Sequence, residues 1–545
     1  MHRPDSRFHR PGRRPRTRRV AAALACAVAL AQAVPPVIAQ VRLPALGESA
    51  AEDFDLGTER RLGQQIMREV RRDPDYLDDP LLLNYLQQLW QPLVAAARQR
   101  GDIGPDIDGL FAWEAFLVRD RSVNAFALPG GYVGVHLGLI AMTATRDELA
   151  SVLAHELSHV TQRHIARSVS NAQRQSMVSI GAMILAILAA GRANNPDMAQ
   201  AALMGGQAAA LQGQLNFSRD MEREADRIGY AVMGGAGFDP AGMAQMFDKL
   251  DQGTRLNDSG AFPYLRSHPL TTERLSEARS RATFGERVPA SPWLHAAMQA
   301  RARVLMDASV VSLRRLQELP APRPGAHPAE RIGALLASAW ASSQLRDHER
   351  AASRLAEARA LLAAQAAPDP ALAQVMALAD VELRLARDDV TGALAELGRL
   401  PAGTPRRPAL LLEGQALLQL RDDSRIPRLK AHTEALQTWV STHGQDAAAW
   451  SQLGRTAEAL GLRLRALRAQ AEARAALGDI PGVVDRLRAG RQLARTAEGG
   501  DFIEASIIEA RLREFEGLRR QLAAEARGNR GERGSPRDDG ESPRL

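Results

Sequence analysis

The chain has 545 residues, more than one hydrophobic core normally holds, so we expect two or three domains. Apolar residues make up 45% and charged residues 24%, the balance of an ordinary globular protein. Residues 1–19 hold eight Arg and one Asp, which accounts for the whole formal charge of +7, so the near-neutral remainder argues against a nucleic-acid partner.

The first 39 residues predict a signal peptide. An Arg-rich start is followed by the apolar stretch 20–34 and then by Val37-Ile38-Ala39, which has the form of a small-residue cleavage site. A transmembrane anchor is the alternative, but the apolar stretch is short for one and Pro35-Pro36 follows it at once. Few apolar residues precede Cys26, the only cysteine, which argues against lipid attachment there. We therefore expect cleavage near Ala39 and an exported, periplasmic protein.

Residues 40–287 predict a domain that mixes helices with a small sheet. Helical spacing covers 56–72 and then a segment after Asp78-Asp79-Pro80. Short β-rich runs flank the turn Pro129-Gly130-Gly131, and they indicate three strands. The predicted strands are 113–118, 122–128 and 132–139, and the later helices are 145–170, 219–233, 239–251 and one from 271.

Residues 177–190 form the most apolar run after the predicted signal. Fourteen residues are too few to cross a bilayer, so we expect a buried or interfacial helix and no transmembrane span after the signal. Contact with the membrane periphery remains compatible with this pattern. The Gly-punctuated stretch 177–214 as a whole is a candidate lid over a cleft.

Residues 294–525 predict an all-α region built from tetratricopeptide-like repeats. Asp389 and Asp423 lie 34 residues apart, the length of such a repeat, and residues 450–454 (WSQLG) match its opening pattern. Other intervals do not hold to 34 residues, so a generic helical bundle is the alternative. Residues 526–545 are polar and rich in Gly and Pro, and we expect a disordered tail.

The sequence AHELSHV at residues 154–160 is typical of a zinc site. His155 and His159 are four residues apart, so on a helix both imidazoles project from one face and can bind one metal ion. Glu156 points to the side and can act as general base for an attacking water without being a ligand. The alternative is two surface histidines beside a glutamate. His164 is expected to face elsewhere, as a surface residue.

A hydrolytic zinc site needs a third protein ligand, and the next candidate lies in SRDMEREAD at residues 218–226. Glu222 and Asp226 are also four residues apart on one helix face. Glu222 can bind the metal while Asp226 accepts a hydrogen bond from a ligand histidine and fixes its tautomer. Glu224 is expected to be a solvated charge. Taken alone, this motif would be an ordinary acidic helix face.

The two motifs together resemble the gluzincin peptidases of the HtpX and CAAX prenyl protease group. Residues 124–131 (NAFALPGG) and 268–274 (HPLTTER) are similar to two further segments of that group. Its membrane members carry hydrophobic spans, so the resemblance narrows to exported soluble members with a C-terminal tetratricopeptide array. It is strong over residues 50–280 and weak over the helical half.

The resemblance implies a role for each motif residue. His155, His159 and Glu222 would bind one zinc ion per chain. His268 would occupy the fourth zinc position and hold the enzyme inactive until it moves away, and Arg274 would lie near the site. For His268 the alternative is a helix-start residue ahead of a proline, although a neutral imidazole is a good zinc ligand.

The same resemblance implies a fold and a function. The fold would be mainly α, with a gluzincin α+β peptidase domain followed by an all-α array. The function would be that of a periplasmic zinc endopeptidase in quality control and assembly of outer-membrane β-barrel proteins. Its partners would be unfolded or misassembled outer-membrane proteins and the β-barrel assembly machinery. The alternative is a chaperone or adaptor whose repeats bind clients while the zinc site is largely shut.

A peptide substrate could be held by strand pairing. The predicted strand at Tyr132, Val133, Gly134 and Val135 would present a free edge to an extended chain, largely independently of side-chain identity. An internal strand is the alternative, and the sequence does not separate the two.

Overall fold

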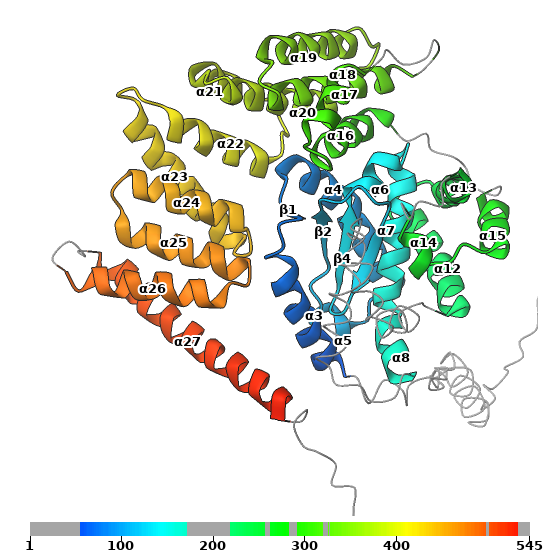
Figure 1. The fold of residues 1–545 in the computed structure, drawn as a ribbon, viewed down its shortest axis with the longest axis horizontal. Helices are drawn as coiled ribbons and strands as arrows, with labels where there is room; N and C mark the ends of the chain where they lie inside the picture. Colours follow the sequence, from blue (N-terminus) through cyan, green and yellow to red (C-terminus); the bar gives the residue numbers. More distant parts are fainter. Residues whose placement is uncertain are drawn as a thin grey trace, which may run out of the picture. The chain divides into compact units, whose positions relative to one another are not determined.

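A computed structural model of the protein describes residues 55–171, 218–256, 262–282, 291–319, 325, 327–496 and 501–531. Within these residues the fold is mainly α, with one small sheet and then a long run of helices, as predicted (Figure 1). The predicted signal peptide, Cys26 and the candidate lid 177–214 lie outside the described residues. None of the described helices is both long and apolar enough to cross a membrane.

The first helices begin and end at residues that suit a helix terminus. In α3 (Leu56–Val70), the Asp55 side chain accepts from the backbone of Thr58, and in α4 (Pro80–Arg100) the Asp79 side chain accepts from that of Leu82. Gly101 ends α4 in a left-handed conformation, which glycine adopts without strain. A short helix, α5 (Pro105–Asp108), follows. The apolar side chains of α4, among them Trp90 and Leu93, are buried in the core.

The sheet has four strands in the order β1-β2-β4-β3. A two-residue strand, β1 (Tyr76–Leu77), pairs antiparallel with β2 (Glu114–Val118), and β2 pairs parallel with β4 (Tyr132–His136). A hairpin joins β3 (Ala125–Leu128) to β4 through Gly130 and Gly131, both at positive φ. The sheet is therefore mixed, because the parallel pair is made by strands that are not neighbours in the sequence.

The prediction of an edge strand at this hairpin is wrong for β4. Its residues are paired on both sides; Val133, for example, lies opposite Ala115 of β2 and Ala127 of β3. The turn fixes the pairing within the hairpin, but only the distant β2 decides which strand takes the inner place. The edge on this side is β3. The residues predicted as the edge and found inside the sheet are Tyr132, Val133, Gly134 and Val135.

The chain after β4 is helical earlier than predicted. Strand β4 ends at His136, and Leu137 already begins α6 (Leu137–Met142). The single helix predicted over 145–170 is two helices, α7 (Arg146–Thr161) and α8 (His164–Asn171). Arg163 between them has φ 52°, and its Nε lies 3.0 Å from Oε2 of the buried Glu59. This long-range ion pair accompanies a break that helical periodicity does not indicate.

A second group of helices lies beside α7 (Figure 1). It comprises α12 (Arg219–Gly235), α13 (Ala241–Leu256), α14 (Tyr264–Ser267) and α15 (Thr272–Ala282). The close approach of α12 to α7 depends on Gly229, where a Cβ atom would meet the backbone of Ala154 at 3.2 Å. Because Gly229 has no side chain, the acidic motif of α12 can reach the histidines of α7.

The rest of the described chain is helical, and helices adjacent in the sequence pack together. Several begin at an aspartate whose side chain caps the first turn, among them Asp347, Asp389 and Asp479. The helices are α16 (Pro292–Leu305), α17 (Val310–Gln317), α18 (Pro328–Gln344), α19 (His348–Ala363), α20 (Pro370–Ala386), α21 (Val390–Leu397), α22 (Arg406–Gln419), α23 (Arg425–Thr442), α24 (Ala447–Ala459), α25 (Arg463–Ala476), α26 (Ile480–Ala494) and α27 (Phe502–Gly531).

Helix α27 extends into the segment predicted as a disordered tail. The run QLAAEAR at residues 521–527 consists of good helix formers, so the helix continues past residue 525. It ends at Gly531. The start of the tail at residue 526 was therefore wrong. Residues 532–545 lie outside the described part of the chain.

Helix α16 packs against α4 and α6. The guanidinium of Arg301 binds both carboxylate oxygens of Asp79, the cap of α4, at 2.7 Å, and Glu382 of α20 at 2.8 Å. His295 lies between the hydroxyl of Tyr85 and the carbonyl of Thr143. The first helix after residue 291 therefore shares its core with the segment that carries the zinc motifs.

Candidate metal centre

Helix α7 carries the imidazole pair in the interior of the fold. His155 and His159 are four residues apart, so their side chains leave the same face of the helix. Their Nε2 atoms lie 2.9 Å apart, and the two residues are 2% and 0% exposed. Every residue from Asp147 to Thr161 is buried. The alternative of two surface histidines is excluded.

Helix α12 brings the carboxylate of Glu222 to the same point. The Ser218 side chain caps this helix, and Glu222 lies in its first turn. Glu222 Oε1 is 3.4 Å from His159 Nε2, and Oε2 is 3.5 Å from His155 Nε2. The carboxylate thus faces both imidazole nitrogens that could bind a metal.

His268 completes the cluster from the end of α14. Its Nδ1 lies 2.9 Å from Glu222 Oε1 and 3.3 Å from His155 Nε2. The ring of Tyr264 stacks on the His268 imidazole with centroids 4.7 Å apart. The ligand atoms of His155, His159, Glu222 and His268 all lie within 4.8 Å of one another, which brings together the four residues that the sequence singles out as metal ligands.

The buried carboxylate of Glu156 indicates that the space beside the cluster is suited to a bound cation. The residue is 0% exposed, and neither carboxylate oxygen accepts a hydrogen bond from a described residue. His268 Nε2 lies 3.5 Å from its Oε1 without hydrogen-bond geometry. Burying a carboxylate without hydrogen bonds is costly, so a group that binds to these two oxygens would stabilise the folded protein. A cation with a water or a substrate would be such a group.

The electrostatics of the cluster also favour a cation. Burial raises the pKa of Glu222, but the neighbouring His268 and His155 outweigh burial and hold this pKa well below its usual range. Burial lowers the pKa of His155, but hydrogen bonds to Asp226 and Glu222 outweigh it and raise the pKa to about 10. Two imidazoles and a carboxylate are the donor set that hydrolytic zinc sites use.

Asp226 and Arg274 support His155 from behind. Asp226 Oδ1 lies 2.9 Å from His155 Nδ1, while the Arg274 guanidinium binds both oxygens of Asp226 at 2.6 and 2.9 Å. Arg274 Nη1 is also 2.8 Å from Glu222 Oε2. Burial raises the pKa of Asp226, but Arg274 and His155 outweigh it and lower that pKa. The carboxylate of Asp226 is therefore ionised and can accept a hydrogen bond from a protonated Nδ1 of His155. This hydrogen bond directs Nε2 of His155 toward the cluster of ligand atoms.

His164 and Glu224 support His159 in the same way, although both are predicted from the sequence to lie at the surface. His164 is 0% exposed, its Nδ1 lies 2.8 Å from His159 Nδ1, and its Nε2 lies 3.0 Å from Glu224 Oε2. Glu224 is also paired with Arg167 at 2.9 Å. Burial lowers the pKa of His164 to about 4.

The prediction for His164 was wrong because it continued the geometry of α7 through residue 163. The left-handed conformation of Arg163 ends that helix, so counting helical turns from His159 gives the wrong direction for His164. The proximity of a third histidine in the sequence was the only available signal.

The comparisons with known proteins bear on the same segment. Residues 83–282 match the model of peptidase family M48. A Vibrio cholerae protein provisionally named beta-barrel assembly-enhancing protease is 38% identical over 273 residues, 50% of this chain and 54% of that protein. The beta-barrel assembly-enhancing protease of Escherichia coli K12 is 36% identical over 241 residues, 44% of this chain and 47% of that protein.

A more distant relative is the mitochondrial metalloendopeptidase OMA1 of Schizosaccharomyces pombe, 28% identical over 240 residues, 41% of this chain and 60% of that protein. The chain thus spans about half the length of the first two relatives. The matched segment 83–282 contains all four residues of the cluster together with Glu156. The predicted resemblance is confirmed at the level of the peptidase family.

Proposed function

We propose that this chain, an M48 peptidase by its residues 83–282, is a zinc-dependent endopeptidase of the periplasm. One observation carries the proposal: the buried Glu156 carboxylate has no hydrogen-bond partner among the described residues and lies beside the cluster of two imidazoles and a carboxylate. A glutamate in this setting is placed to move protons at a reacting centre.

In the proposed mechanism His155, His159 and Glu222 would hold the zinc ion. When bound, zinc polarises a peptide carbonyl and lowers the pKa of water. Glu156 takes a proton from the water that attacks the carbonyl carbon. It then delivers that proton to the amide nitrogen as the carbon–nitrogen bond breaks. Asp226 keeps the Nδ1 proton of His155 in place, so the Nε2 lone pair stays directed at the metal.

An extended polypeptide would be held at the outer edge of β3. This strand is paired only with β4 among the described strands, and it packs against α7, the helix of the imidazole pair. Pairing with a free strand edge uses backbone hydrogen bonds and is largely independent of side-chain identity. We therefore propose that β3, and not β4, is the strand that pairs with the substrate. Pairing of this kind suits a protease with many unfolded substrates.

The substrates we propose are misassembled outer-membrane β-barrel proteins, and the partner is the β-barrel assembly machinery. Support comes from the names of the relatives, which are 36% to 38% identical over about half of this chain. The signal-like residues 1–39 and the long helical region support the periplasmic location and the binding of client proteins.

The test of catalysis is Glu156→Gln in the full chain. We expect casein hydrolysis to fall by about two to four orders of magnitude, the usual range for a lost general base. One zinc ion per chain, measured by atomic emission, should remain, because Glu156 is not among the proposed ligands. Glu273→Gln, an exposed glutamate on α15, is the control and should keep its activity. Envelope function that survives in Glu156→Gln would instead favour a chaperone or adaptor.

His268 is proposed to restrain the enzyme by occupying the fourth ligand position. Its Nδ1 lies beside the ligand atoms of Glu222 and His155. In the proposed mechanism a substrate carbonyl would take this same position. We expect His268→Ala to raise casein hydrolysis or self-cleavage, because the position is then open to substrate. His443→Ala, an exposed histidine at the end of α23, is the control. Unchanged or lower hydrolysis in His268→Ala would contradict the restraint.

A further inference from the structure

A cavity of about 540 Å³ lies away from the metal centre, between α16, α18 and the connection from α6 to α7. Part of its wall is apolar, formed by residues such as Met142, Pro292 and Leu319. Its polar lining consists of Gln299, Arg303, His327 and Glu330. Its volume lies within the range of small-ligand sites, which combine apolar walls with a few polar groups.

Arg303 is the unusual residue in this wall. Its side chain is half-buried, and its one hydrogen bond to a described residue goes to the Ala141 carbonyl at 3.3 Å. Burial lowers the pKa of Arg303, and no acidic side chain opposes that effect. The charge of Arg303 is therefore partly desolvated without a carboxylate to compensate it.

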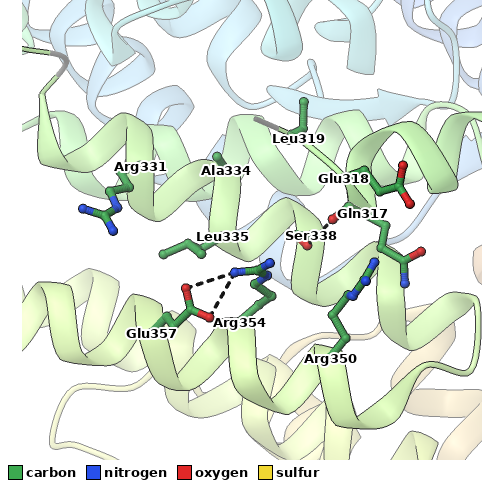
Figure 2. Close-up of a pocket in the computed structure, with 10 residues that line it drawn as sticks. All are labelled: Gln317, Glu318, Leu319, Arg331, Ala334, Leu335, Ser338, Arg350, Arg354 and Glu357. Carbon is green, nitrogen blue, oxygen red and sulfur yellow. Dashed lines mark hydrogen bonds and ion pairs between the residues drawn. The ribbon is translucent and has the colours of Figure 1, made fainter. Parts of the chain in front are cut away.

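Other arginines nearby are paired with carboxylates. Arg301, on the same helix, is bound by the carboxylates of Asp79 and Glu382. A neighbouring cavity of about 330 Å³ between α17, α18 and α19 is also lined by arginines, and Figure 2 shows Arg354 there paired with Glu357. Arg303 differs from both, because its cavity lining includes Glu330 but no ion pair joins the two among the described residues.

We propose that this cavity binds the C-terminal residue of a polypeptide, with its carboxylate on Arg303 and its apolar side chain against the apolar wall. A guanidinium is the preferred partner of a carboxylate because it offers parallel N–H donors. Gln299 adds a reason to choose a peptide over a simple fatty acid. Its Nε2 donates to the Thr143 carbonyl at 2.7 Å, which leaves Oε1 to accept a backbone N–H that a fatty acid lacks.

The position of the cavity connects it with the proposed function, on which the choice of a polypeptide ligand rests. Met142 and Ala144 line it and belong to the connection that leads from α6 into α7, the helix of the imidazole pair. A chain end bound here would be held where residues 83–282, the M48 segment, meet the first helices of the α-helical region. The site would recognise a terminus, whereas the proposed edge of β3 would accept internal segments.

Fluorescence anisotropy on the full-length Glu156→Gln protein tests the proposal, because hydrolysis cannot then remove the probe. The probe is a fluorescein-labelled Gly-Ser-Gly-Ala-Leu peptide, once with a free carboxylate and once amidated. We expect the amide to bind about tenfold more weakly or worse, since a charge-assisted hydrogen bond is lost. Arg303→Gln should remove the difference. Arg331→Gln, an exposed arginine lining the neighbouring cavity, should keep it.

Equal binding of acid and amide, or an undiminished difference in Arg303→Gln, would overturn the proposal. If Arg303→Gln does not fold, Ala334→Phe, at a half-buried position in the wall, should abolish binding of the free acid by filling the cavity. Octanoate that competes as well as the unlabelled peptide would overturn the choice of a polypeptide. Casein hydrolysis by the wild type is measured separately, so loss of peptide binding with hydrolysis intact contradicts this inference alone.

Discussion

At the scale of single residues, both imidazoles that α7 contributes to the metal centre are held by a further polar side chain. Asp226 faces Nδ1 of His155 at 2.9 Å, and His164 faces Nδ1 of His159 at 2.8 Å. Each of these two partners is in turn bound by a charged side chain, Arg274 in the case of Asp226 and Glu224 in the case of His164. Side chains that orient metal ligands typically change metal affinity even though they do not touch the ion.

We expect His164→Ala to weaken zinc binding by roughly ten- to a hundredfold, the same range as Asp226→Ala. The reason is that the ring of His159 loses the group that fixes its orientation at Nδ1. Competition against a chromophoric chelator measures the affinity of the full chain, and the exposed His443→Ala serves as the control. Wild-type affinity in His164→Ala would remove this residue from the metal centre.

At the scale of elements, α16 connects the M48 segment with the later helices through a buried histidine. His295 Nε2 donates to the Thr143 carbonyl at 2.9 Å, so its Nδ1 accepts from the Tyr85 hydroxyl at 2.6 Å. Burial lowers the pKa of His295 to about 4, and the nearby Lys249 on α13 and Arg303 on α16 act in the same direction. The ring is therefore neutral in the folded protein, and both of its nitrogens are used.

This histidine predicts a loss of stability in acid. Between its ordinary pKa of 6.5 and the folded value of about 4, the unfolded chain binds a proton that the folded chain does not. Stability therefore falls as pH falls through this window, by roughly 3 kcal/mol at most. Denaturant titrations at pH 7.5 and pH 4.5 should show a smaller loss for His295→Gln than for the wild type. An equal loss in the two proteins would contradict the assignment, and His443→Gln is the exposed control.

At the scale of the whole molecule, the same interface contains an ion pair of Arg301 with Asp79 and Glu382. The Arg301 and Asp79 side chains are each 8% exposed, so the charges are largely desolvated. The cation also lies 5.1 Å from the ring centroid of Trp340. Four helices, α4, α16, α18 and α20, meet at this one guanidinium. The M48 segment and the first helices after it should therefore unfold together.

We expect Arg301→Ala to lower the free energy of unfolding by roughly 3 kcal/mol or more, because it leaves buried carboxylates unpaired. Arg488→Ala removes an exposed pair with Glu516 at the other end of the chain and should leave the free energy of unfolding nearly unchanged, because exposed ion pairs contribute little. Urea titrations followed by circular dichroism and by zinc release measure both. Zinc release at a urea concentration well below the loss of helix would show that the two segments unfold separately.

Much of the metal centre could be predicted because it depends on local geometry. The four-residue spacings of His155 with His159 and of Glu222 with Asp226 put each pair on one face wherever the helix packs. The hairpin was equally local, since Gly130 and Gly131 supply the positive φ values of its turn. The mainly α fold followed from helical periodicity over the long C-terminal part.

The sequence by itself determined which side chains share a helix face and which strands share a turn. The tertiary structure alone decided that β3 and not β4 is the edge, that α7 ends at a left-handed Arg163, and that His164 turns inward. It also placed α16 against α4. Each of these depends on contacts between segments far apart in the chain, and such contacts follow from the packing of the whole core and not from local periodicity.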